Sequence, residues 1–288
     1  MYREFYGLIR SPFEMTPDPA FLYLGESHQE GLATLVYGVQ ARKGFVLLTG
    51  EVGTGKTTLL HALLAQLDPS TASAFLFNPK RVELVDRTGC GEGTRVDVAD
   101  GPSLTCSPGL VDPGNPVFAA REDGRGGSRK PLAAEFRFAG RRLFFVNLHL
   151  ASKGGDDPLF GRRQPPKTPS VDRRNAQTGV VAEFVGALLT RDPKAGVVVL
   201  GDLNDFEASE PLATLEEVGL ENLVVRMPLD DRYTYVYMGN SQVLDHILVS
   251  PSLTGGADVD IVHLNAEFPT ADRVSDHDPV IVRLSFVP

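Results

Sequence analysis

Three apolar segments in the last third of the chain each end in an acidic residue, and this repetition most limits the possible folds. The acids are Asp202 in residues 201–205 (Gly-Asp-Leu-Asn-Asp), Asp245 in residues 244–246 (Leu-Asp-His) and Asp276 in residues 275–279 (Ser-Asp-His-Asp-Pro). Residues 147–149 (Asn-Leu-His) end a fourth apolar run. Functional side chains commonly lie at strand ends and in the loops beyond them. We therefore expect a sheet with a polar site at the ends of its strands.

Apolar patterning predicts both strands and a helix around these motifs. The predicted strands are 135–138, 143–150, 197–200, 233–237, 243–249 and 280–284. Apolar residues at helical spacing predict a helix over 176–189, which Asp192-Pro193 ends. This mixture indicates a layered α/β sandwich. Residues 86–130 hold many Gly, Pro and Asp residues with little periodicity, so we expect low order there.

The N-terminal part contains a phosphate-binding loop. Residues 45–49 read as a buried strand, 50–57 (GEVGTGKT) fit the pattern G-x-x-x-x-G-K-[ST], and 58–67 read as a helix. Backbone N–H groups of such a loop surround a phosphate, and the helix N-terminus adds positive charge. The predicted nucleotide-binding residues are Gly50, Gly53, Gly55, Lys56, Thr57 and Thr58. No apolar run between residues 67 and 142 ends in the acidic pair that an NTPase of this kind needs.

Composition bounds the class of protein. With 42% hydrophobic and 23% charged residues, the chain is globular. No apolar run approaches the ~20 residues that span a bilayer, and the N-terminus lacks the apolar core of a signal peptide. We therefore expect a cytoplasmic protein without a membrane span. Cys90 and Cys106 show no metal-binding spacing and are interpreted as incidental thiols, since disulfides are rare in the cytosol.

Charge argues against indiscriminate binding of polyanions. Residues 1–74 carry 7 acids and 5 bases, a net charge of −2, which leaves −7 of the total −9 for the remainder. An acidic domain binds nucleic acid poorly unless metals or a local basic groove compensate.

The residue types at the C-terminal motifs suit metal-assisted attack on a phosphate. Asp276 offers hard oxygen ligands for magnesium or manganese. Its neighbour His277 could contact the phosphate, with Asp245 fixing its tautomer and stabilising its protonated form.

Three further residues complete this interpretation. Asp202 could orient or deprotonate the attacking water, and Asn204 could donate to a phosphate oxygen. His149 could stabilise developing charge or protonate the leaving group.

Each residue also has a structural interpretation. A lone Asp after a strand is commonly a cap or turn residue, and this applies most to Asp205 and Asp278. A lone histidine such as His149 is more often a hydrogen-bonded core residue. Strand alternation points His246 away from Asp245. The four motifs in one order, rather than any single member, favour a site.

The N-terminal residues 1–74 resemble the start of secretion-pathway ATPases of the ExeA/GspA type, in the AAA superfamily. The resemblance is carried by residues 1–8, 11–13, 16–24 and 44–58, the last of which includes the phosphate loop. It implies ATP as ligand, while the family's Walker B acids, sensor and arginine finger are absent.

Residues 75–284 resemble the endonuclease/exonuclease/phosphatase superfamily, the group of DNase I. The landmarks are residues 75–82, 128–136, 147–149, 201–205, 244–247 and 275–279. The resemblance implies Mg²⁺ or Mn²⁺ as cofactor and a phosphodiester, with nucleic acid among the options, as substrate. By this resemblance, Asp276 is a metal ligand and Asp245 pairs with His277. Asp202 and Asn204 contact the attacking water and the phosphate. His149 is the second catalytic histidine, and Arg129 contacts a phosphate. Similar proteins are often exported.

The family's first strands, with an Asn and a metal-binding Glu, are absent here. Glu51 and Glu83 are the nearest acids, but neither lies in the family's motif. We therefore predict an α/β fold in which an incomplete DNase I-like sandwich (75–288) follows a phosphate-loop NTPase fragment (1–74). The seam lies near 74–79, where Ala-Phe-Leu-Phe-Asn-Pro suits both families.

Three functions follow, from different classes. The first is a metal-dependent phosphodiester hydrolase, impaired by the missing Glu. The second is an ATP- or GTP-binding module, and the third is a chimera of two truncated domains without function. The sequence does not distinguish DNA, RNA, a lipid phosphate or a small phosphodiester as substrate.

Overall fold

The computed structural model divides the chain into two compact units, residues 1–72 and 73–288. It describes residues 25–40, 59, 62–63, 75, 77–85, 94–101, 103–119, 129–157, 161–269, 273 and 275–285. All six predicted nucleotide-binding residues lie outside this described part of the chain. The predicted boundary near residues 74–79 stays a prediction.

In unit 1, helix α2 (Glu26–Gln40) packs on a short apolar cluster. Its Leu35 is buried against Leu59 and Leu63, two leucines of the segment predicted to be a helix. Of that segment, residues 59, 62 and 63 are described and helical.

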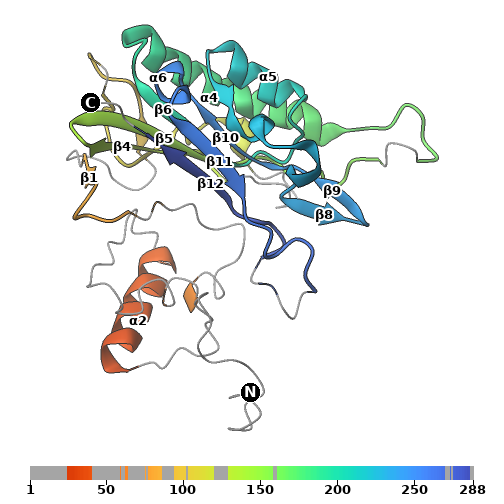
Figure 1. Ribbon diagram of the computed structural model, residues 1–288, viewed down its shortest axis with the longest axis horizontal. Helices are drawn as coiled ribbons and strands as arrows, with labels where there is room; N and C mark the ends of the chain where they lie inside the picture. Colours follow the sequence, from red (N-terminus) through yellow and green to blue (C-terminus); the bar gives the residue numbers. More distant parts are fainter. Residues whose placement is uncertain are drawn as a thin grey trace. The chain divides into compact units, whose positions relative to one another are not determined.

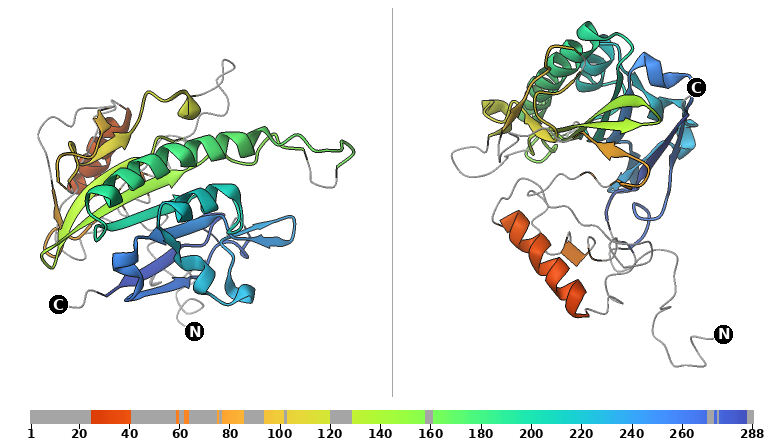
Figure 2. Two further views of the ribbon diagram at one scale, coloured as in Figure 1. Left: turned by 90° about the horizontal axis from the view of Figure 1, so that it is seen from above. Right: turned by 90° about the vertical axis from the view of Figure 1, so that its left-hand side faces the viewer.

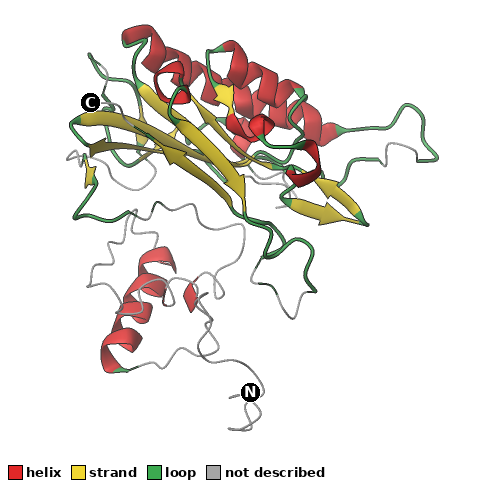
Figure 3. Ribbon diagram, viewed as in Figure 1, coloured by secondary structure: helices red, strands yellow, loops and turns green. Residues whose placement is uncertain are grey.

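Unit 2 is built around a mixed sheet, so the predicted α/β class is confirmed (Figures 1 and 3). Its strands run in the order β2 (Arg95–Val96), β3 (Gly109–Val111), β4 (Leu132–Phe138), β5 (Arg141–His149), β6 (Gly196–Asp202), β10 (Asp245–Val249) and β7 (Glu221–Asn222), with β1 (Glu83–Leu84) also paired to β4. Strands β5 and β6 are parallel, whereas β4 and β10 run antiparallel to these neighbours. The sheet therefore contains four of the predicted strands, β4, β5, β6 and β10, whereas those predicted at 233–237 and 280–284 form parts of two-stranded sheets.

The remaining elements connect or cover this sheet. They are η2 (Pro116–Phe118), α4 (Pro169–Arg191), α5 (Glu210–Glu217), η3 (Leu223–Arg226), η4 (Leu229–Asp231), β8 (Tyr235–Tyr237), β9 (Asn240–Gln242), α6 (Pro251–Thr254), β11 (Ala257–Ile261) and β12 (Val280–Leu284). No helix in the described residues is both long and apolar enough to cross a bilayer.

Helices α4 and α5 cover one face of the main sheet (Figures 1 and 2). Helix α4 begins with Pro169 in its first turn, where the missing N–H costs no hydrogen bond, and Asp192 caps its end. Its buried stripe includes Val181, Val185 and Leu188, which pack on alternate residues of β5 and β6. Each fully buried aliphatic side chain of this kind contributes about 1.5–3 kcal/mol.

The opposite face carries a smaller second layer. Strands β11 and β12 pair antiparallel and pack on Leu143, Val198 and Ile247 of the main sheet. An aromatic cluster continues this face. The rings of Phe136 and Phe145 meet edge to face, with 5.5 Å between their centroids. Within the described residues, this second layer has two strands.

Within residues 86–130, the structure describes residues 94–101, 103–119 and 129–130, and these are more ordered than the composition of the stretch indicated. Strands β2 and β3 fall in this stretch, and Leu104, Val111 and Phe118 are buried in the core. These strands have two or three residues each, too few for a visible alternation. Cys106 is buried and disulfide-bonded, so its interpretation as an incidental thiol was wrong. The other cysteine, Cys90, lies outside the described residues.

Strand β6 contains a glycine, Gly201, at which the backbone of β5 leaves no space for a side chain. Its φ is +133°, and a Cβ there would lie 2.0 Å from the carbonyl oxygen of Leu148. We predict that Gly201→Ala lowers the free energy of unfolding by roughly 2–6 kcal/mol. Gly179→Ala in helix α4, where a Cβ meets nothing within 4 Å, should raise it by about 0.5–1 kcal/mol. Urea denaturation followed by far-UV circular dichroism, since the chain has no Trp, measures both. Equal stabilities for the two variants would contradict the close packing of β5 on β6.

Candidate active site

Strand register brings three predicted site residues into one row across the sheet. In the parallel pair β5–β6, His149 lies opposite Asp202, and in the antiparallel pair β6–β10, Asp202 lies opposite Asp245. The three side chains share the face that carries β11 and β12, because Leu200 and Ile247, two residues along their strands, pack there. His149 Nε2 is 3.8 Å from Asp202 Oδ2. The sheet thus presents an imidazole and two carboxylates side by side at its polar end.

A loop residue completes this cluster. His277 precedes β12, and its Nδ1 is 2.6 Å from Asp245 Oδ2. Its backbone N–H donates to Ser275 Oγ at 3.1 Å, and its carbonyl accepts from Asn265 Nδ2 at 2.8 Å. These bonds fix His277 over the end of β10.

Asp278 has a structural role in the same loop. Its Oδ1 accepts the backbone N–H groups of Leu264, Asn265 and Ala266 at 2.7–3.0 Å, and its Oδ2 lies 3.0 Å from His263 Nδ1. The carboxylate therefore joins two loops rather than facing the cluster. This agrees with its interpretation as a turn residue.

The hydrogen bond from Arg129 fixes the tautomer of His149. Arg129 Nη1 contacts His149 Nδ1. A guanidinium can only donate, so Nδ1 accepts and the proton of a neutral His149 lies on Nε2, facing Asp202. Burial, with the charges of Arg129 and His277, lowers the pKa of His149 to about 4. His149 is therefore a neutral hydrogen-bond donor at pH 7.

The pKa values of Asp202 and His277 are both raised. Burial and the Asp245 charge raise the pKa of Asp202 to about 6. Burial opposes protonation of His277, but its hydrogen bond to Asp245 and the charges of Asp245, Asp202 and Asp276 raise its pKa to about 9. At neutral pH the site holds an imidazolium beside a carboxylate that gives up its proton near pH 6.

Three residues of this cluster form a set that could bind a divalent cation. Ligand atoms of Asp202, Asp245 and His277 all lie within 4.8 Å of one another. Asp276, predicted as a metal ligand, is exposed and is not a member of this group. No glutamate among the described residues belongs to it. Glu83 lies on β1, 3.7 Å from Arg137, and Glu51 lies outside the described residues.

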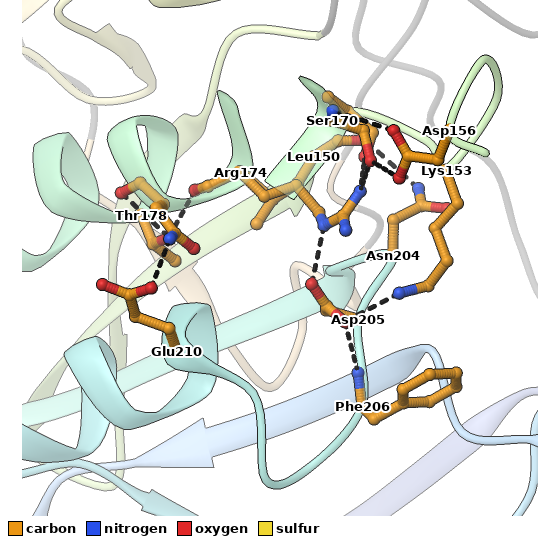
Figure 4. Close-up of polar contacts among 12 residues, drawn as sticks. Leu150, Lys153, Asp156, Ser170, Arg174, Thr178, Asn204, Asp205, Phe206 and Glu210 are labelled. Atoms are coloured by element: carbon orange, nitrogen blue, oxygen red, sulfur yellow. Dashed lines mark hydrogen bonds and ion pairs between the residues drawn. The ribbon is translucent and has the colours of Figure 1, made fainter. Parts of the chain in front are cut away.

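A buried ion-pair network holds the loop that follows β6 (Figure 4). Arg174 of α4 is 1% exposed, and its Nε donates to Asp205 Oδ2 at 2.8 Å. Lys153 Nζ donates to Asp205 Oδ1 at 2.7 Å. Burial opposes ionisation of Asp205, yet these two cations hold its pKa below the ordinary value. Asp205 therefore anchors the loop after β6, which agrees with its interpretation as a turn residue.

Asn204 lies between this anchor and the row. Its φ is +53°, a conformation that Asn tolerates, and its backbone N–H donates to Asp202 Oδ1 at 2.8 Å. Its side-chain amide donates to the Leu150 carbonyl at 3.1 Å. Asn204 thus orients Asp202 and ties β6 to the loop after β5, while its predicted contact with a phosphate stays a prediction.

His246 supports the loop from the opposite face of the sheet. It is fully buried, with Nε2 2.9 Å from the Asp205 carbonyl and Nδ1 3.0 Å from Asn222 Nδ2. Burial lowers its pKa, so it is neutral. The prediction that His246 points away from Asp245 is confirmed.

Sequence reasoning missed Arg174 and Lys153. A usable signal existed for Arg174, since it continues the buried stripe of α4 toward the N-terminus at helical spacing from Thr178 and Val181. Lys153 lies in an irregular loop and carries no such signal.

A surface pocket lies elsewhere in unit 2. It has a volume of about 410 Å³ and is lined by Arg141, Arg142, Lys194 and neighbouring residues at the start of β5 and β6. It contains none of the clustered residues.

The N-terminal part of the chain is similar to AAA proteins. Residues 39–97 match the AAA domain family model AAA_22, so the match crosses the predicted seam. General secretion pathway protein A of Aeromonas hydrophila is 53% identical over 83 residues, which are 29% of this chain. The chain spans 15% of that relative's length.

Solved structures similar to the chain have low sequence identity. Truncated TDP2 of Caenorhabditis elegans has a TM-score of 0.45 at 13% identity and covers 93% of this chain and 94% of its own. The mannosyl-6-phosphatase of Bacteroides thetaiotaomicron has a TM-score of 0.44 at 18% identity, and the match covers 73% of this chain and 69% of that protein. The endonuclease/exonuclease/phosphatase of Bacteroides vulgatus has a TM-score of 0.43 at 15% identity, and the match covers 73% of this chain and 69% of that protein.

The buried carboxyl of Asp202 should cost stability when ionised. A carboxyl whose pKa is raised on folding binds its proton more tightly in the folded state, so this stability is lost as pH rises from the ordinary pKa of Asp through about 6. We predict that Asp202→Asn, which keeps the acceptor for Asn204, raises the free energy of unfolding at pH 8 by about 1–3 kcal/mol and changes it little at pH 4.

Urea denaturation in EDTA tests this difference. Asp258→Asn, the same change at an exposed acid of β11, is the matched control and should have little effect at either pH. An Asp202→Asn variant no more stable than the parent at pH 8 would show that the carboxyl is not desolvated.

Proposed function

We propose that unit 2 is a divalent-cation-dependent phosphodiester hydrolase domain with weak activity. The observation that carries the proposal is the clustering of His149, Asp202, Asp245 and His277, in which the pKa of His149 is lowered and the pKa values of Asp202 and His277 are raised. Hydrolysis of a phosphodiester needs a group that takes a proton from water and another that donates to phosphate oxygens. The resemblance of residues 75–284 to the endonuclease/exonuclease/phosphatase superfamily supports the same reaction.

Each residue has a role that follows from its environment. Asp202, ionised above about pH 6, orients the attacking water and accepts its proton. His277, held as an imidazolium by Asp245, donates from Nε2 to a phosphate oxygen. The Nε2–H group of His149 donates a hydrogen bond to the leaving-group oxygen, on which negative charge develops as its bond to phosphorus breaks, and Arg129 orients His149 and adds positive charge.

Asp245 would hold the cation, and Asp202 would act on a water molecule beside it. Magnesium sites often use one or two carboxylates together with the substrate's phosphate, and this donor set fits that pattern. The cation, Mg²⁺ or Mn²⁺, would neutralise the non-bridging oxygens of the substrate. Weak activity follows from the described residues, in which no glutamate joins this set. The charge of exposed Asp276 helps to keep His277 protonated, and the role of Asp276 as a metal ligand stays a prediction.

A second candidate function is nucleotide binding at residues 50–58. It is supported by the AAA family match over residues 39–97 and by 53% identity to a secretion protein over 83 residues. Lys56 is the residue expected to contact the outer phosphates of ATP.

One assay separates the two candidates. We predict slow hydrolysis of bis(4-nitrophenyl) phosphate that requires Mg²⁺ or Mn²⁺ and falls about 100-fold or more in His277→Gln and in Asp202→Asn. Asp258→Asn is the matched acidic control and should retain activity. Lys56→Ala should leave this hydrolysis intact and abolish binding of ATP, measured by calorimetry.

Two outcomes would contradict the proposal. Hydrolysis that persists in both His277→Gln and Asp202→Asn would show that these residues do not take part in the reaction. Hydrolysis that disappears in Lys56→Ala would assign the activity to unit 1.

A further inference from the structure

Three neighbouring rings, of which two are stacked, lead from the active site to the surface of unit 2. The Tyr235 ring lies 4.8 Å from the His277 ring, at an interplanar angle of 34°. Tyr237 continues the series, 6.4 Å from Tyr235 and nearly parallel to it at 14°. Tyr237 is 51% exposed and Met238 at the hairpin tip is 82% exposed. We call Tyr235 and Tyr237 the tyrosine ladder.

The ladder is fixed relative to the catalytic residues. Tyr235 forms a β-bridge with His277. The Thr234 carbonyl accepts the backbone N–H of Asp278 at 2.8 Å, and Thr234 Oγ1 accepts the N–H groups of Leu244 and Asp245 at 3.1 and 3.2 Å. The hairpin β8–β9 is thus bonded to both motifs that supply the histidine–aspartate pair, so an aromatic group bound at Tyr237 has a defined position beside the site.

A basic segment lies at the same end of unit 2. Residues 161–168 contain Arg162, Arg163 and Lys167, all exposed. The base of this segment is fixed because Asp157 N–H donates to the Lys167 carbonyl at 2.8 Å and Lys167 N–H donates to Asp157 Oδ2 at 2.9 Å. The segment and hairpin β8–β9 project from one end of unit 2 in two perpendicular views (Figures 1 and 2). In a chain of net charge −9, these cations lie at the same end of unit 2 as hairpin β8–β9, and one of them, Arg163, also lies 3.5 Å from the carboxylate of Asp157.

We infer that the tyrosine ladder is a stacking subsite for a nucleobase that flanks the reacting phosphate, so that the substrate is single-stranded nucleic acid. This inference rests on the proposed function and names its substrate class. Successive bases stack on exposed aromatic rings while basic side chains follow the phosphates, a combination typical of single-strand binding. A duplex keeps the faces of its bases covered, and a lipid phosphate or a small phosphodiester without a ring has nothing to stack.

Binding without turnover tests the subsite directly. Fluorescence anisotropy with the full chain in EDTA compares a labelled decathymidylate with a decamer of the same phosphate count in which every base is absent. The parent protein should bind the base-containing strand about 5- to 100-fold more tightly. Tyr237→Ala should remove this preference, and Tyr237→Phe, which keeps the ring, should retain it. Equal affinities of the parent for the two strands, or a preference that survives in Tyr237→Ala, would overturn the inference.

The basic segment provides an independent readout. In the double variant Arg162→Gln, Arg163→Gln, the salt dependence of binding should weaken by about 1.4 in the slope of log K against log salt, equally for both strands. An unchanged slope would overturn the assignment of this segment to the phosphates.

The two proposals can fail separately. A base preference that depends on Tyr237, without Mg²⁺-dependent hydrolysis of bis(4-nitrophenyl) phosphate, supports the subsite and contradicts the hydrolase. Hydrolysis without base preference supports the hydrolase and contradicts the subsite.

Discussion

The site depends on the register of strand β6 with its two neighbours. Pairing with β5 places Asp202 opposite His149, and pairing with β10 places it opposite Asp245. Because alternate side chains point to opposite faces, the same register buries Val197 and Val199 under α4. A slip of one residue would expose these valines and turn Asp202 into the apolar core. The hydrophobic core therefore holds the polar row in place.

The polar groups around the row divide into those that hold the backbone and those that remain available for chemistry. Asp205 and Asp278 are buried, and cations or backbone N–H groups satisfy them. Burial raises the pKa of Asp202 and the neighbouring Asp245 carboxylate raises it further, whereas the cations beside Asp205 hold its pKa below the ordinary value. Ionisable groups with opposed shifts close together are typical of active sites. Stability is thus concentrated in the supporting network, and the row carries the electrostatic cost.

Much of the central sheet is predictable from local patterns, but the periphery and the supporting contacts are not. The run of valines before Leu200 and the helical spacing through Val185 and Leu188 predict β6 and α4, since both elements bury a regular face. Pairing order and register are long-range properties, so the position of Asp245 opposite Asp202 could not be read from spacing. The family resemblance supplied the Asp245–His277 pair. The bond of Cys106 and the anchoring role of Arg174 come from tertiary packing, which a single sequence does not encode in its periodicity.

The central claim is that the cluster keeps one histidine charged and another neutral at physiological pH. A titration of the histidine side-chain resonances by nuclear magnetic resonance tests it most directly, with His277→Gln and His149→Gln variants to assign the signals among the six histidines. The geometry predicts that His277 titrates at about 9 and His149 at about 4. Two histidines that both titrate near the ordinary pKa of about 6.5 would show that the row does not form as described.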